Sequence, residues 1–200
     1  MNAVDATALT WIQGALTLDA AAFATFTRAA NASGLALLTP FAGGLSHAVG
    51  QSVALFANRV APWRFAASLA TGSLTFTASV LIWSAGVYIT ARLLLQYDVP
   101  VWDVLRVVGL AHAPRMFGFL TFTPYFGSGI GVLLTLWTYL ALSVGVRSAF
   151  GLGQLEALAT MGAAWILSEI AGRTLGRPAA AGLRWLRSRW LPHETRPVPS

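Results

Sequence analysis

The residues best suited to chemistry stand together in the segment His112-Ala113-Pro114-Arg115. This segment lies near the middle of a stretch, residues 101–122, that we expect to cross a lipid bilayer. A charged side chain at that depth is costly and by default marks a functional site. With His47 and Glu169 from neighbouring helices, His112 and Arg115 therefore form a candidate intramembrane polar site, able to hold a headgroup or to relay a proton.

The same residues also allow a structural interpretation. Pro114 has no N–H, so the carbonyl of Leu110 would lose its helical partner and the helix could end early. Arg115 would then extend towards the lipid headgroups. Neutral imidazoles bind metals and tetrapyrroles, but two isolated histidines are a weak signal. A polar contact between helices is the favoured interpretation of His47 and His112, and we predict no metal and no cofactor.

Other spacings predict contacts between structural elements. Gly127 and Gly131 have the small-xxx-small spacing that lets membrane helices approach closely, within the chain or between two copies. Asp103 and Arg106 are three residues apart and can pair on one helix face. Glu156 suits the first turn of a helix. No Ser/His/Asp set and no pair of carboxylates has a catalytic spacing, so we do not expect an enzyme.

Composition indicates that most of these elements lie in lipid. Charged residues make up 10% of the chain and hydrophobic residues 56%, against about 25% charged residues in soluble proteins. The mean hydropathy is +0.65. From Phe65 to Ala91 the chain carries no charged side chain, and a helix of this length would measure about 40 Å. Cysteine is absent, which excludes disulfides, thiolate metal sites and cysteine nucleophiles.

We therefore predict an all-α fold, a polytopic transmembrane bundle of about five spans. The spans are expected near residues 35–56, 65–95, 101–122, 127–146 and 154–175, with an irregularity at 40–44 in the first. They would form a membrane domain over residues 34–175. Before it, residues 1–33 are expected to form a loosely docked interfacial segment, in which Thr17 or Asp19 caps a helix that ends near Ala30. A break is expected at residues 31–34.

The last segment, residues 176–200, is predicted to be a basic tail on the cytoplasmic side. Arg184, Arg187 and Arg189 lie among Leu and Trp residues at helical spacing, which is typical of an amphipathic helix on an anionic membrane surface. Arginine bias in the loops places this tail inside and the N-terminus across the membrane. We expect a bacterial inner membrane, with a thylakoid membrane as the alternative, and no nucleic-acid partner despite the net charge of +6.

Small and apolar residues follow one another in a characteristic order between residues 105 and 164. They are Val108-Gly109-Leu110-Ala111, Ala113-Pro114, Pro124, Gly127, Trp137, Gly145-Val146-Arg147, Ala149, Gly151 and Glu156-Ala157. In this order and spacing the stretch resembles the membrane domain of the YIP family (Ypt/Rab-interacting proteins), which has bacterial members. The resemblance implies a five-span helical domain. Eukaryotic members act in vesicle traffic by binding Rab GTPases and each other, and the family brings no established catalytic residues.

Three functions stay open on the sequence. The first is a non-enzymatic YIP-like membrane protein that organises membrane or stabilises a complex. Its partners would be the lipid bilayer and other integral membrane proteins or further copies of itself. The second is a small lipid- or ion-handling carrier that uses the polar site on the third span. The third is an accessory subunit of an energy-converting complex, with a pigment near His47 or His112.

Overall fold

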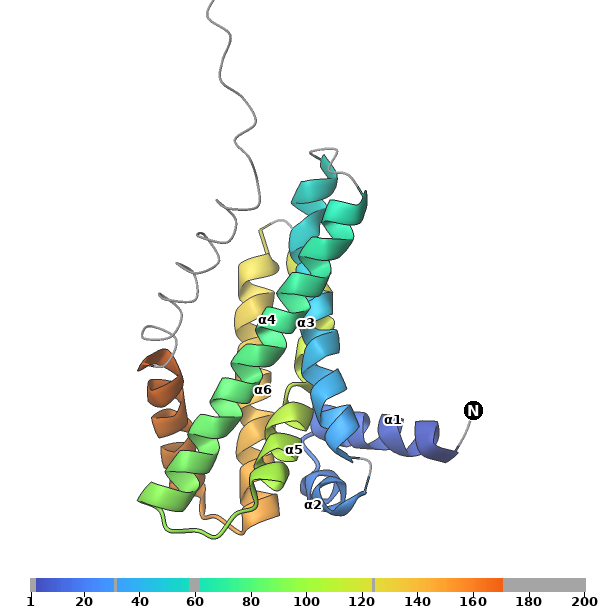
Figure 1. Cartoon of the computed structure of the whole chain (residues 1–200). Helices are drawn as coiled ribbons and strands as arrows, with labels where there is room; N and C mark the ends of the chain where they lie inside the picture. The colour runs from blue at the N-terminus through green and yellow to red at the C-terminus, as the bar shows by residue number, and fades with distance from the viewer. Residues whose placement is uncertain (1–2, 31, 58–61, 124, 171–200) are drawn as a thin grey trace, which may run out of the picture.

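The structure, a computed structural model, describes residues 3–30, 32–57, 62–123 and 125–170 (Figure 1). Its labelled elements are α1 (Ala3–Leu16), α2 (Ala20–Arg28), α3 (Ala32–Ala57), α4 (Pro62–Ile89), the π-helix η1 (Thr90–Leu94), α5 (Val101–Ala111), the 3₁₀-helix η2 (Ala113–Phe122) and α6 (Gly127–Phe150). Residues 154–170 form a further helix. The described residues contain no strand, so the all-α prediction is confirmed for this part of the chain.

Two of the described helices are long and apolar enough to cross a membrane. They cover Phe65–Leu93, which is α4 with most of η1, and Gly127–Phe150, which is α6. Both coincide with predicted spans. Only 11% of the apolar stretch of Phe65–Leu93 is buried inside the structure, and 33% of the apolar stretch of Gly127–Phe150. Most of this apolar surface therefore faces outward, α4 more than α6.

The prediction of the third span, residues 101–122, as one continuous helix is wrong. α5 ends at Ala111, and the chain continues after His112 as the 3₁₀-helix η2, which begins at Ala113-Pro114. Since Pro114 cannot donate to the carbonyl of Leu110, the α-helical pattern stops there. The tighter pattern takes over, and the N–H of Arg115 donates to the carbonyl of His112 at 2.9 Å. The early helix end expected from Pro114 is therefore confirmed.

The irregularity expected at residues 40–44 is also wrong, because α3 continues through Pro40 without interruption. The two glycines that follow serve close packing instead. A Cβ atom on Gly43 would lie 2.8 Å from the Cβ of Arg115, and one on Gly44 would lie 2.9 Å from the Cβ of Phe76. α3 therefore approaches η2 on one side and α4 on the other, as Figure 1 shows for α4.

The N-terminal segment packs more firmly than expected. The carboxylate of Asp19 accepts a hydrogen bond from the N–H of Ala21 at 2.9 Å and caps α2, as predicted for this residue. The helix ends at Arg28, and α3 already begins at Ala32, so Ser33 and Gly34 are helical and not part of a break. Phe23 and Phe26 of α2 are completely buried in the core, which excludes loose docking of this helix.

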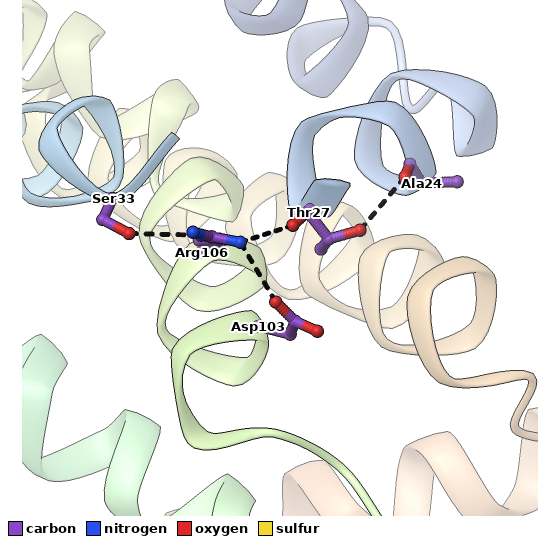
Figure 2. A network of polar contacts seen from close by, with 5 residues as sticks. All are labelled: Ala24, Thr27, Ser33, Asp103 and Arg106. Atoms are coloured by element: carbon purple, nitrogen blue, oxygen red, sulfur yellow. Dashed lines mark hydrogen bonds and ion pairs between the residues drawn. The ribbon is translucent and has the colours of Figure 1, made fainter. Parts of the chain in front are cut away.

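A half-buried arginine joins three helices at this end of the bundle (Figure 2). Arg106 of α5 donates from Nη1 to the carbonyl oxygen of Thr27 at 2.6 Å and to the carboxylate of Asp103 at 3.2 Å. Its Nε donates to the hydroxyl of Ser33 at 3.2 Å. The predicted Asp103–Arg106 pair is confirmed. The same guanidinium also satisfies a carbonyl in the last turn of α2, which has no partner within the helix.

The last described helix is held against α4 and the loop before α5. Its N-terminal Glu156 accepts hydrogen bonds from the N–H of Gly153 at 2.8 Å and from the hydroxyl of Tyr97 at 2.9 Å. This places Glu156 in the first turn, as predicted. Further along, Gly86 of α4 lies against the backbone of Ala164. The rest of the predicted fifth span and the basic tail lie outside the described residues.

Candidate functional site

The break between α5 and η2 borders a pocket of about 290 Å³. Its walls come from α4, the His112–Arg115 segment, α6 and the helix at residues 154–170. The lining residues are Phe76, Ser79, Val80, Ile82, Trp83, His112, Arg115, Tyr139, Trp165 and Ser168. The structure thus brings together two of the four candidate site residues, His112 and Arg115, in one pocket.

His112 is 4% exposed and is held in one orientation. Its Nδ1 donates a hydrogen bond to the carbonyl of Val108 at 2.7 Å, one helical turn back. Because a carbonyl can only accept, the proton is assigned to Nδ1, and Nε2 of the neutral ring is then an acceptor. The imidazole also stands edge-on to two aromatic rings, with centroids 5.8 Å from Phe76 and 5.6 Å from Trp83.

Arg115 is half-buried and directed to α6. Its Nη2 donates to the hydroxyl of Thr135 at 3.0 Å. Its Nε is buried and has no hydrogen-bond partner in the part of the chain that the structure describes. No carboxylate pairs with Arg115 within that part either. The guanidinium therefore keeps both a free donor and an unneutralised charge beside the pocket.

Trp83 and Tyr139 belong to the pocket although sequence reasoning did not single them out. The indole Nε1 of Trp83 is buried and lacks a hydrogen-bond partner among the described residues. Its ring stands edge-on to Tyr139, with a centroid distance of 5.4 Å. The sequence did contain a signal for Trp83, because this residue lies well inside the predicted span 65–95, whereas tryptophan is normally enriched at the ends of a span. An indole N–H at that depth needs an acceptor.

His47 lies outside this pocket, in a neighbouring groove between α3 and α4 of about 1320 Å³. Its Nε2 is 2.9 Å from the side-chain amide of Gln51, and the opposite wall carries Thr71, Thr75 and Ser79. Phe76 and Ser79 line both spaces. His47 is thus adjacent to the pocket without being part of it.

The other predicted site residues are spread over the fold. Glu169 is exposed and follows Ser168, which lines the pocket, but it does not line the pocket itself. Gly127 lies against the backbone of Thr121 in η2, and Gly131 faces the methyl group of the same threonine at 4.0 Å. Both glycines thus face their own chain in this structure. Arg184, Arg187 and Arg189 lie outside the described residues.

The pocket is arranged for binding a group that accepts hydrogen bonds. Arg115 and Trp83 line it and carry buried N–H donors without partners, and the remaining walls are aromatic, aliphatic and, at two positions, serine. Comparisons with protein-family models, curated proteins and solved structures found no match for this chain. The resemblance to the YIP family therefore stays a prediction from the sequence of residues 105–164.

Proposed function

We propose that this chain is a non-enzymatic, multi-pass integral membrane protein that organises membrane or stabilises a membrane complex through helix contacts. The observation that carries the proposal is the uncovered apolar surface of α4. Leu74 is 61% exposed, and Leu81, Ile82 and Ile89 are each exposed by about two fifths. Burying one such side chain completely is worth about 1.5–3 kcal/mol, so this surface favours lipid or a partner helix over water.

α6 supports the same proposal from another side of the bundle. Its large outward side chains are Val132, Leu133, Leu136 and Leu140, each more than half exposed. Two apolar faces on separate helices suit a protein that contacts lipid and neighbouring membrane proteins, or further copies of itself. The likeness to the YIP family agrees with an organising role. The five-span bundle and the bacterial inner membrane belong to this proposal.

The absence of cysteine from the chain allows a direct test in native membranes. A cysteine at Leu81, on the outward face of α4, is expected to cross-link to a neighbouring membrane protein or to a second copy. The matched control is Val87→Cys on the same helix, because Val87 is fully buried and its thiol should give no adduct. A strictly monomeric, uncross-linked Leu81→Cys protein would contradict the organising role. Recovery of the chain in the soluble fraction without detergent would contradict membrane insertion.

A small lipid- or ion-handling carrier is the second candidate, and the pocket at His112 and Arg115 favours it. A carrier needs a polar site inside the membrane, and such sites hold the rare ionisable residues found there. Arg115→Leu separates the two functions. Loss of flux in reconstituted vesicles with unchanged folding would support a carrier. An unchanged set of cross-linked partners without any flux in the parent protein would support the organising role.

A further inference from the structure

Two of the residues that line the pocket carry donors that the described protein does not satisfy. The Nε of Arg115 and the Nε1 of Trp83 are both buried and lack partners among the described residues. In proteins such groups are almost always hydrogen-bonded, because a buried donor without an acceptor loses its hydration without compensation. Neither atom is open to the pocket in this arrangement, so an occupant that accepts hydrogen bonds removes this cost once the two side chains turn towards it.

The charge of the lining residues indicates an anionic occupant. Among the described lining residues Arg115 is the one arginine, and its hydrogen bond to Thr135 does not neutralise it. No Asp or Glu of the described part of the chain lines the pocket. A guanidinium prefers planar or tetrahedral oxyanions such as carboxylate and phosphate. An ammonium group would find no carboxylate in this lining and would be repelled by Arg115.

An apolar groove of about 580 Å³ continues from the same place, between α6 and the helix at residues 154–170. Tyr139 and Trp165 line both the pocket and the groove. Beyond them the groove is lined mainly by apolar side chains, among them Leu136, Leu158 and Met161. A charged site thus adjoins an apolar one, which matches a molecule that has a phosphate at one end and a hydrocarbon chain at the other.

We propose that this pocket and groove bind one anionic phospholipid, whose phosphate is held by Arg115 and Trp83 and whose acyl chain lies between α6 and the last described helix. A glycerol headgroup, which carries no ammonium, fits the pocket better than choline or ethanolamine. The site goes beyond the organising role proposed above, since either an organising protein or a carrier could use it.

The headgroup half of the site is tested by lipid retention. The full chain, purified in mild detergent with equal amounts of phosphatidylglycerol and phosphatidylcholine, is analysed by native mass spectrometry. We expect one retained phosphatidylglycerol. Trp83→Phe keeps an aromatic ring and removes the N–H. This variant and Arg115→Gln should each weaken the retention of phosphatidylglycerol about 10- to 100-fold, since each removes a hydrogen bond to a charged group.

Matched substitutions elsewhere control for general effects on the fold. Trp102→Phe alters a tryptophan that is 62% exposed, and Arg92→Gln alters an exposed arginine that pairs with Asp98. Neither residue lines the pocket, so both variants should retain lipid as the parent protein does. Equal retention of the two lipids, or equal losses in pocket and control variants, would overturn the proposal.

The acyl half of the site separates a phospholipid from free phosphate. Gly162 lines the groove, and no heavy atom lies within 4 Å of a Cβ built on it. Gly162→Leu should therefore fold normally, fill the groove and reduce phosphatidylglycerol retention. Gly129→Leu is the control, because Gly129 has equally open space and does not line the groove. If Gly162→Leu retains the lipid fully, or if inorganic phosphate competes for the site as well as phosphatidylglycerol does, the lipid assignment is overturned.

Discussion

Arg106 is expected to contribute more to stability than its ion pair alone would suggest. Arg106→Gln removes the guanidinium that joins α2, α3 and α5 (Figure 2). The ion pair with Asp103 is 3.2 Å long, and the two side chains are 19% and 30% exposed, so it should contribute about 0.3–1 kcal/mol. The bond to the carbonyl of Thr27 is a partly buried, charge-assisted hydrogen bond of about 1.5–3 kcal/mol. The total loss should be about 2–4 kcal/mol.

The assay is unfolding by sodium dodecyl sulfate in mixed micelles, followed by the fluorescence of the eight tryptophans. Asp103→Asn should cost no more than about 1 kcal/mol, because it leaves the contacts with α2 and α3 in place. Arg92→Gln is the matched control. Its ion pair with Asp98 has the same length of 3.2 Å, but its side chains are 50% and 94% exposed, so we expect almost no change in the free energy of unfolding.

Equal losses for Arg106→Gln and Asp103→Asn would refute this reasoning, since the backbone contact would then contribute nothing. A loss for Arg92→Gln as large as that for Arg106→Gln would refute it as well, because burial would then not distinguish the two arginines. A double-mutant cycle of residues 103 and 106 isolates the ion pair and should give less than half of the total.

Three further predictions follow from single contacts. Gly145→Ala should destabilise the fold by about 1–3 kcal/mol, because its Cβ would lie 2.8 Å from side-chain atoms of Phe23 and Val107. Gly129→Ala, in open space, should not destabilise it. Thermal unfolding of the two variants measures the difference in stability. Ser46→Ala should cost about 1–3 kcal/mol in the same assay, since its hydroxyl donates to the carbonyl of Met116 at 2.7 Å and accepts from the N–H of Phe119 at 2.9 Å. The hydrogen bond to the Glu156 carboxylate raises the pKa of Tyr97 above its usual value. The stabilisation from this bond is therefore complete below the unfolded pKa of about 10 and is lost as the pH rises through the folded pKa. The phenolate absorbance that Tyr97→Phe removes should appear above pH 10, and its appearance below pH 10 would contradict the assigned bond.

The features that the sequence predicted correctly depend on local patterns. The charge-free stretch that begins at Phe65 and the apolar run after Gly127 became α4 and α6, because length and hydropathy suffice to define such helices. The capping role of Asp19 and the pairing of Asp103 with Arg106 also follow from short spacings. His112 and Arg115 were singled out by the rarity of ionisable residues in apolar segments; the structure places both at one pocket, and a functional role for them stays a prediction. Trp83 and Tyr139 were not singled out, because an aromatic residue in an apolar helix resembles ordinary core, and the unpartnered N–H of Trp83 is visible only in the structure.

Two of the wrong predictions, the continuous third span and the irregularity at residues 40–44, have one physical cause. Pro40 and its following glycines suggested a break in α3, whereas the break lies in the facing segment, after His112. A 3₁₀-helix inside an apolar bundle needs neighbours that satisfy its irregular backbone groups. Ser46 of α3 supplies two such hydrogen bonds to η2.

Close contact is also required for these bonds. Gly43 lies against Arg115, and Gly118 of η2 lies against the backbone of His47, where a Cβ would be 3.0 Å from the His47 Cα. Gly43 of α3 is therefore explained by the break in another segment, a relation that no pattern within α3 contains. The same approach of α3 to η2 holds the backbone that carries Arg115 at the edge of the pocket. Enlarging Gly43 should for this reason disturb the position of Arg115 before it disturbs α3.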